Sequence, residues 1–518
     1  MEPVSLAFAA CSMVDLCIKC GKVLYSRCQA YREAEREVAN AIIYIEGYWL
    51  KIEDQVTTLR EIWHGLDERL QVHQNYVLQT LQEILESAVH TLDNLFWEPD
   101  STSKIENLVA KQGQIKRLKY VARGKRSLER VIEQLGRWNR QFDPSWILLS
   151  RISLPVIQEQ LAKKEQSGVK SITPIRELRE AHEKSKIPSH DSSTSIFLDE
   201  NYTITDIEEI PLTTASTGLA PNGMVVIIDK HTIRENAEFK AIKKDIRDLA
   251  TILSKADPAF SSLLPCQGVI VAKDQAYFRI IFSIPEELTF DRPCSLRSLL
   301  VTTEAYSLNE RLHIGTSLAR SVVFLHASRI VHKSISPENI IILPSAAGAL
   351  ETPLLVGFER FRFNEQRTNM AGDNLWEKNL YRHPARQGLH PEEIYDMRHD
   401  IYSTGVCLLE LGLGSSFVNY SDDQKIPSAR LPIADMLAAK NKRKAAVEIK
   451  SVLINLAKSY LPQQMGRIYT DTVIACLTCL DPSSPLFKDE SEFEDEDGIL
   501  VGVRYIEKIL FELEKIRV

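Results

Sequence analysis

The sequence predicts a multidomain protein of 518 residues: an N-terminal all-α four-helix bundle, followed by a C-terminal α+β part built as two lobes. Two observations predict this division. Over residues 1–150, apolar residues recur at alternating steps of three and four, the spacing of one helix face. After residue 196, short runs of β-branched residues replace that period, and sequence typical of helices returns later in the chain.

Composition and charge exclude several classes of protein. With 44% apolar and 26% charged residues, the chain can form ordinary buried cores. Its 63 basic and 70 acidic residues give a net charge of -7, so we expect no nucleic-acid partner. The nine cysteines are too sparse for a disulfide scaffold. The pairs Cys17/Cys20 and Cys476/Cys479 lack partner histidines, which favours buried thiols in a reducing cytoplasm over a metal site.

The first segment, VSLAFAACSMVDLCIKC, superficially looks like a signal peptide or membrane anchor. It lacks a basic start, and Asp15 interrupts it before the roughly 18 to 20 apolar residues that a spanning helix needs. Asp15 and Lys19 have the spacing of an i,i+4 ion pair. We expect either the central helix of the bundle or a segment that prefers lipid once released. Its candidate lipid-facing side chains are Leu6, Phe8, Met13 and Leu16.

Three further helices follow from heptad-like spacing, and the first two of them are expected to pack antiparallel. The expected buried positions are Val38, Ile42, Ile45, Trp49, Ile52, Val56, Leu59 and Trp63 in the second helix, Leu78, Leu81, Leu85, Ala88, Leu92 and Leu95 in the third, and Leu128, Val131, Leu135, Trp138 and Phe142 in the fourth.

A basic segment, residues 111–130, carries eight cations and the single anion Glu129, a net charge of +7. It is either a solvated basic face or a surface attracted to anionic lipid, worth about 1 kcal/mol for each basic residue near the headgroups. The residues assigned to lipid contact are Lys116, Arg117, Lys119, Arg123, Lys125 and Arg126.

The N-terminal sequence resembles the HeLo and HeLo-like domains of fungal incompatibility proteins. The resemblance covers residues 1–150 and rests on the opening EPVSLAFAACSMVDL, on Trp49 in a long second helix, and on LKYVARGKRSLERVIEQLGRWNRQFDPSW. Those domains are similar in architecture to the four-helix killer domain of mixed-lineage kinase domain-like proteins. The resemblance implies regulated membrane permeabilisation, with the first helix released and inserted.

Residues 151–196 form a connector, in which a charged sequence typical of helices precedes the loop-like KIPSHDSSTS. It is either a helical brace or a passive linker. Residues 197–285 then contain the strand-like runs MVVIID, GVIVA and AYFRIIFSI around one helical stretch, and residues 286–518 are mainly helical. A small sheet lobe before a larger helical lobe is the layout of a kinase-like domain.

Three motifs make this resemblance to protein kinases specific. IVHKSISPENIIIL resembles the catalytic loop HRDxxxxN, LLVGFE stands at the place of DFG, and HDIYSTGVCLLEL resembles the helix whose aspartate, here Asp400, anchors the loop. The resemblance implies a two-lobed protein-kinase-like fold.

The individual residues within those motifs argue against phosphoryl transfer. Ser334 stands at the position of the catalytic base, and its hydroxyl cannot accept a proton as a carboxylate does. Gly357 replaces the metal-binding aspartate in the triplet Gly357, Phe358 and Glu359, and a glycine-rich lid is missing. Asn339 is retained but is a weak ligand by itself. We expect His332 to pack in the loop core and Glu359 to make a surface contact.

The lysine that pairs with nucleotide phosphates is ambiguous, because either Asp229 or Lys230 aligns with it. Its partner on the neighbouring helix is Asp245. If Asp229 points inward, two carboxylates face the phosphates and nucleotide binding should fail. If a bulge turns Lys230 inward, weak ATP binding without Mg²⁺ is expected. No cofactor is required in either case.

Two further features concern regulation. Lys333 replaces the arginine of HRD, and its single ammonium cannot grip a phosphorylated loop in a bidentate manner. Thr368, in NEQRTNM, is the candidate phosphosite. Residues 488–498 carry seven acidic residues, and form either a solvated loop or a contact with the basic segment that keeps the bundle inactive.

Together these features predict a pseudokinase that controls a membrane-active bundle in regulated cell death or signalling. The expected partners are a second copy of the chain, anionic membrane lipids, and an upstream kinase or receptor of unknown identity. The expected location is the cytoplasm, with conditional recruitment to the plasma membrane. An active kinase with an unusual site and a soluble signalling scaffold are the alternatives.

Overall fold

The computed structural model divides the chain into two compact units, Met1–Thr173 and Pro174–Val518. Residues 97–124, residues 142–195, which include the 151–196 connector except Ile196, and Thr368 lie outside the residues that it describes. Described are residues 3–30, 36–63, 66, 68–96, 125–141, 196–199, 201–233, 239–272, 277–284, 293–302, 306–343, 352–363, 374–388, 395–421, 424–482, 484, 486–493 and 502–516.

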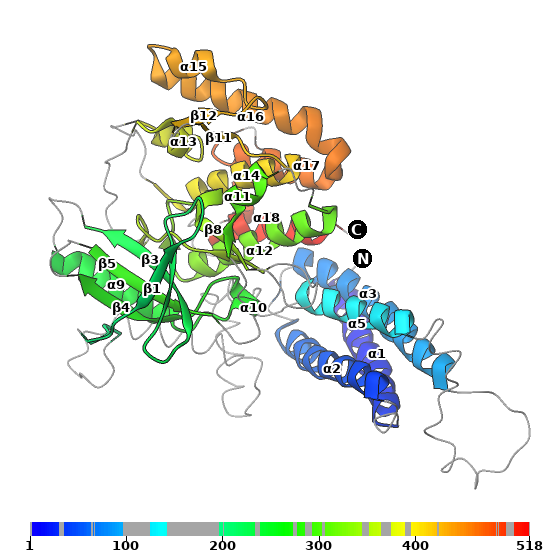
Figure 1. The fold of residues 1–518 in the computed structure, drawn as a ribbon. Helices are drawn as coiled ribbons and strands as arrows, with labels where there is room; N and C mark the ends of the chain where they lie inside the picture. The colour runs from blue at the N-terminus through cyan, green and yellow to red at the C-terminus, as the bar shows by residue number, and fades with distance from the viewer. Residues whose placement is uncertain are drawn as a thin grey trace, which may run out of the picture. The chain divides into compact units, whose positions relative to one another are not determined.

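The first unit is helical (Figure 1, blue to cyan). Its described helices are α1 (Pro3–Ala30), α2 (Arg36–Ile62), α3 (Glu68–Phe96) and α5 (Lys125–Gln141). Helices α1 and α5 each pack against both α2 and α3. The expected direct pairing of α2 with α3 is therefore not the main contact, because the apolar stripes of both helices are shared between α1 and α5.

The heptad positions form the core of this unit. In α2, the side chains from Ile42 to Leu59 that were expected to be buried are at most 1% exposed, and those from Leu78 to Leu92 in α3 are fully buried. Gly21 of α1 lies directly beneath the indole of Trp49, because a Cβ built on Gly21 would stand 1.9 Å from the ring. The lack of a side chain at Gly21 thus allows the largest side chain of the α2 seam to reach α1.

The charged and lipid-assigned residues of α1 differ in part from expectation. Asp15 forms an ion pair with Arg60 of α2 at 3.0 Å, and not with Lys19, because the neighbouring helix offers a guanidinium. Met13 is half-buried and Leu16 is 37% exposed. Leu6 and Phe8 lie in α1, but their side chains are outside the described set.

The basic residues assigned to lipid lie mostly outside the described part of the chain. Arg126 is exposed on α5, and Lys125 begins that helix. The other four, Lys116, Arg117, Lys119 and Arg123, are in the segment that the structure does not describe. Within the described residues, every helix is too short or too polar to cross a membrane.

The second unit begins with a five-stranded antiparallel sheet in the order β1-β2-β3-β5-β4 (Figure 1, green). Helix α9 (Phe239–Leu253) packs against β4. The strands are β1 (Thr205–Glu209), β2 (Ser216–Leu219), β3 (Val225–Thr232), β4 (Cys266–Ala272) and β5 (Tyr277–Ser283). A helical first region followed by a sheet-containing second region is thereby confirmed.

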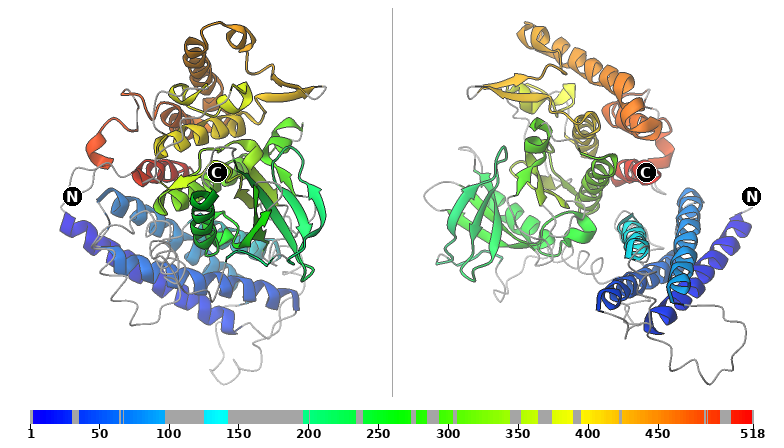
Figure 2. Two further views of the ribbon diagram at one scale, coloured as in Figure 1. Left: turned by 90° about the vertical axis from the view of Figure 1, so that its left-hand side faces the viewer. Right: turned by 45° about the vertical axis from the view of Figure 1, so that its right-hand side comes forward.

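The rest of the second unit is mainly helical, with α14 (Met397–Leu413) at its centre (Figure 2). All residues of α14 except Arg398 are buried, and α12, α16, α17 and α18 pack around it. The helices are α10 (Pro258–Ser261), α11 (Leu296–Val301), α12 (Leu308–Ala327), α13 (Trp376–Asn379), α15 (Ala434–Ala438), α16 (Lys442–Gln464), α17 (Gly466–Leu477) and α18 (Val503–Glu514).

Short strands hold the loops of this helical part. Strands β6, β8 and β9 form a three-stranded sheet, β7 pairs with β10, and β11 pairs with β12. The strands are β6 (Cys294–Ser295), β7 (Ile330–Val331), β8 (Ile340–Leu343), β9 (Thr352–Leu355), β10 (Arg362–Phe363), β11 (Val418–Ser421) and β12 (Gln424–Pro427). The loop between β7 and β8 is thus fixed at both ends.

Replacing Gly21 with alanine should destabilise the helical unit, although alanine favours helices. The added methyl group must displace Trp49, and overpacking of this kind costs about 1 to 3 kcal/mol. Gly47→Ala is the matched control, because among the described residues nothing lies within 4 Å of a Cβ at Gly47. The control should gain up to about 1 kcal/mol from helix propensity. Denaturant unfolding followed by tryptophan fluorescence measures both, and equal stabilisation by both would contradict the packing.

Candidate functional site

The loop between β7 and β8 is anchored from below by Asp400 of α14. The Asp400 carboxylate accepts hydrogen bonds from the backbone N–H groups of His332, at 2.8 Å, and Lys333, at 2.9 Å. Burial alone would raise the pKa of Asp400, but a hydrogen bond with His326 and nearby positive charge hold that pKa below its ordinary value. Lys333 has a φ of +67°, a left-handed conformation that these two bonds to Asp400 help to maintain.

His332 packs in the core of the loop. Its side chain is fully buried, its Nε2 lies 3.1 Å from the carbonyl oxygen of Val356, and its ring centroid lies 4.9 Å from that of Phe358. Burial lowers the pKa of His332 to about 4. At neutral pH His332 is therefore an uncharged packing residue that joins the β7–β8 loop to the segment after β9.

Asn339 occupies the space beside Gly357. The Asn339 amide donates to the carbonyl oxygen of Ser334 at 2.6 Å. Gly357 has a φ of +84°, and a Cβ built there would stand 2.3 Å from Cγ of Asn339. A side chain at position 357 would thus require Asn339 to move, and would also be strained in this backbone conformation.

Asp229 is the inward residue of the ambiguous pair on β3. It is 2% exposed, and its Oδ2 accepts from the backbone N–H groups of Gly357, at 3.0 Å, and Phe358, at 2.8 Å. Lys230 is exposed, with Nζ 4.5 Å from the centroid of the Tyr277 ring. Because successive strand residues face opposite sides, a regular β3 buries one of this pair and exposes the other.

Asp229 is desolvated, and Glu359 is the nearby acidic group that acts in the same direction on its pKa. Burial raises the pKa of Asp229 to about 6, against the opposing effect of its backbone hydrogen bonds. His231, two residues along β3, places Nδ1 3.1 Å from the carbonyl oxygen of Phe358. Asp245 is half-buried on α9, and Glu359 is exposed. Strand β3 therefore holds the 357–358 backbone through Asp229 and His231.

The loop between β1 and β2 contacts the start of α11 and reaches Asn339. The carbonyl oxygen of Pro211 accepts from the hydroxyl groups of Ser295 and Ser298, each at 3.0 Å. The hydroxyl of Thr214 lies 3.5 Å from Oδ1 of Asn339, at the limit of a hydrogen bond. The stretch that lacks a glycine-rich motif is thus tied to the helical part at two points.

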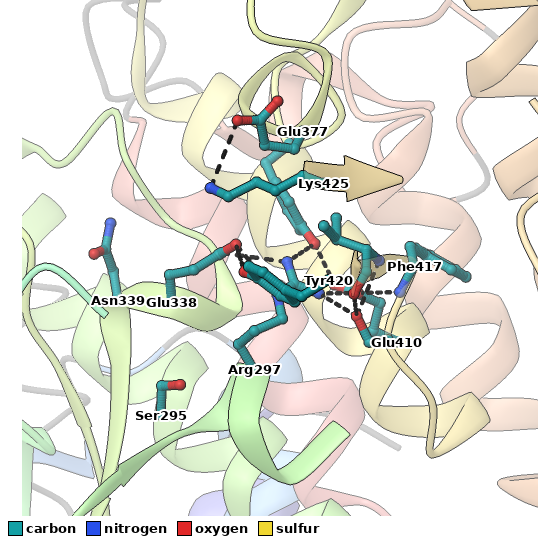
Figure 3. Close-up of polar contacts among 12 residues, drawn as sticks. Ser295, Arg297, Glu338, Asn339, Glu377, Glu410, Phe417, Tyr420 and Lys425 are labelled. Carbon is teal, nitrogen blue, oxygen red and sulfur yellow. Dashed lines mark hydrogen bonds and ion pairs between the residues drawn. The ribbon is translucent and has the colours of Figure 1, made fainter. Parts of the chain in front are cut away.

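A buried arginine lies beside Glu338, the residue before Asn339 (Figure 3). Arg297 of α11 is fully buried, with its guanidinium 2.6 Å from Glu410 and 3.2 Å from Glu338. The hydroxyl of Tyr381 also contacts this guanidinium. Burial raises the pKa of Glu410, whereas the positive charge of Arg297 overcomes burial and lowers the pKa of Glu338.

The sequence did not indicate this arginine cluster or the role of Ser295 and Ser298. The partners of Arg297 are 41 and 113 residues distant along the chain, so no local pattern could reveal them. For Ser295 there was one local signal: a serine directly before a helical run is a frequent N-cap, and Ser295 caps α11.

A cluster of cations, Lys333, Arg362 and Arg386, surrounds Tyr395. The Lys333 Nζ is 5.7 Å and the Arg386 Cζ 5.6 Å from the centroid of the Tyr395 ring, and Arg362 donates to the Tyr395 carbonyl oxygen. Burial, with the positive charges of Arg362 and Arg386, lowers the pKa of Lys333 to about 7. Arg362 and Arg386 are themselves buried, at 7% and 5% exposed.

Similarity to known proteins is weak and partial. No model of a protein family matches the chain. The chain is 29% identical over 128 residues, 23% of its length, to the RasGEF domain-containing serine/threonine-protein kinase X of Dictyostelium discoideum. It is 26% identical over 178 residues, 33% of its length, to the mixed lineage kinase domain-like protein of Mus musculus. The chain spans 12% of the first relative and 35% of the second.

Asp229→Asn should stabilise the second unit at neutral pH. The folded pKa of about 6 exceeds the ordinary value of 3.8, so this carboxyl favours folding most below pH 3.8 and loses that contribution as the pH rises through 6. An amide oxygen in the same place can still accept from both N–H groups. The gain in unfolding free energy should rise from about zero at pH 4 to roughly 1 to 3 kcal/mol at pH 7.5.

Denaturant unfolding across this pH range measures the effect, with the exposed Lys230→Gln on the same strand as control. A loss of stability of equal size at every pH would show that the carboxylate is not desolvated as described.

Proposed function

We propose that the protein is a non-catalytic pseudokinase effector, in which the second unit controls a membrane-active helical first unit. The observation that carries the proposal is the carboxylate of Asp229, buried against the backbone at Gly357. In an active kinase a lysine and a metal-binding aspartate serve these positions. Here an anion stands at the first and no side chain at the second.

A kinase-like fold of the second unit is part of this proposal. Its support is the order of elements: an antiparallel sheet with one helix, then a loop held by Asp400 on a central buried helix. The names of the two similar proteins both contain the word kinase, which also supports a kinase-like fold.

The groups around Asn339 support the lack of phosphoryl transfer. Ser334 provides a neutral hydroxyl where a carboxylate base is needed, and Asn339 is engaged by the Ser334 carbonyl. Within the described residues, no group of three or more His, Cys, Asp or Glu side chains is placed to hold a metal ion. That the chain has no substrate and requires no cofactor is part of this proposal, and it rests on Ser334 and Asn339.

The trigger that we propose is phosphorylation of the loop that contains Thr368. The cation cluster of Lys333, Arg362 and Arg386 is suited to a phosphate group, and a bound dianion would raise the lowered pKa of Lys333. An upstream kinase or receptor would act at this point. The helical unit would then self-associate at an anionic membrane.

The membrane step can be tested with the first compact unit, residues 1–173. This fragment should release dye from vesicles that contain anionic lipid, and not from neutral vesicles. Replacing Lys116, Arg117, Lys119, Arg123, Lys125 and Arg126 with glutamine should reduce leakage about tenfold or more, since each basic residue near the headgroups contributes about 1 kcal/mol.

A control replaces Lys22 and Lys51, two exposed cations outside the basic segment, with glutamine, and should leak as the native fragment does. Absence of leakage from anionic vesicles at every concentration would refute a membrane-active unit. Leakage that persists after removal of residues 1–20 would refute a role for the first helix.

A further inference from the structure

A second concentration of positive charge lies on the other compact unit, at the start of α16. Lys440, Lys442, Arg443 and Lys444 are four cations within five residues, and all four are exposed. The chain as a whole has a net charge of -7, so this density runs against the overall composition. Together with Val447, we call these residues the α16 basic surface.

The position of these cations is unfavourable for the helix itself. α16 is 23 residues long, with Asn441 as its N-cap, and its first turn contains no acidic residue. A helix N-terminus carries a partial positive charge, so cations placed there destabilise the helix. The sequence thus keeps a charge pattern that folding alone does not favour.

Apolar side chains accompany the cations. Val447, one turn after Arg443, is 53% exposed. Met436 and Leu437 of the adjoining helix α15 are half-buried. Residues 434–447 contain no aromatic side chain that could stack on a nucleic-acid base. Cations beside exposed aliphatic groups are the combination that binds the interface of an anionic membrane.

The charges nearby leave the surface positive. Asp435 and Glu448 are exposed acidic neighbours, and Glu448 lies 3.7 Å from Lys444. Lys442 donates to the carbonyl oxygen of Leu437 at 2.5 Å, which fixes it at the junction of α15 and α16. Both helices lie at the end of this unit opposite its five-stranded sheet (Figure 2).

We propose that the α16 basic surface binds anionic lipid headgroups and holds the second unit directly on the membrane. This inference rests on the proposed function for its biological setting and extends it, because membrane binding would then not be confined to the helical first unit. Val447 would enter the headgroup region, with the four cations pairing with lipid phosphates and carboxylates.

The test uses the full chain in which the six basic residues from Lys116 to Arg126 named above are glutamine, so that the first unit contributes little attraction. Binding to phosphatidylcholine vesicles with and without phosphatidylserine is measured by flotation. This chain should still bind the anionic vesicles. Adding Lys440→Gln, Lys442→Gln, Arg443→Gln and Lys444→Gln should weaken that binding by roughly a hundredfold to a thousandfold.

The matched control adds glutamine at Arg430, Lys458, Arg467 and Lys488, four exposed cations elsewhere in the unit that change the net charge equally. Its binding should change less than about threefold, because these four charges are spread over 59 residues of the chain and not gathered within five. The α16 variant should unfold at a temperature no lower than its parent, which separates lost binding from lost folding.

Unchanged binding of the α16 variant, or an equal loss in the control, would overturn the inference. Tighter binding to a single-stranded RNA than to anionic vesicles would also overturn it. Failure of the first unit to cause leakage would contradict the proposed function and leave α16 binding standing, so the two can fail independently.

Discussion

The organisation of the second unit depends on one buried carboxylate. The Asp229 carboxylate accepts hydrogen bonds from the backbone N–H groups of Gly357 and Phe358. These bonds connect the sheet to the segment that follows β9. A buried carboxylate is costly, and burial raises its pKa to about 6. The two backbone N–H donors offset part of this cost, and we propose that the buried carboxylate disfavours binding of an anionic nucleotide at this place.

Neighbouring contacts reinforce this closure. On one side, Pro211 is held by Ser295 and Ser298. On the other, Asn339 fills the space beside Gly357 and bonds to Ser334. Buried Arg297 holds Glu338, which fixes the backbone next to Asn339. We propose that these contacts hold the second unit in one conformation. Binding of a partner or of a phosphate group, and not catalysis, would shift the unit to another conformation.

Sequence spacing predicted the helical unit well, because the heptad positions from Ile42 to Leu92 are local and periodic. The sequence also located the β7–β8 loop and Asp400, because both lie in motifs that resemble those of protein kinases. It could not decide between Asp229 and Lys230, since that choice depends on the register of β3. The Arg297 cluster depends on residues far apart in the chain, and spacing carries no information about such contacts.

The most direct test of this proposal is calorimetric titration of ATP into the full chain at neutral pH, with and without Mg²⁺. If Asp229 excludes nucleotide phosphates and position 357 holds no metal, as we propose, the titration gives no saturable heat and no dependence on Mg²⁺. Saturable Mg²⁺-dependent binding, together with phosphoryl transfer that Asn339→Ala abolishes, would contradict it and require an enzyme in its place.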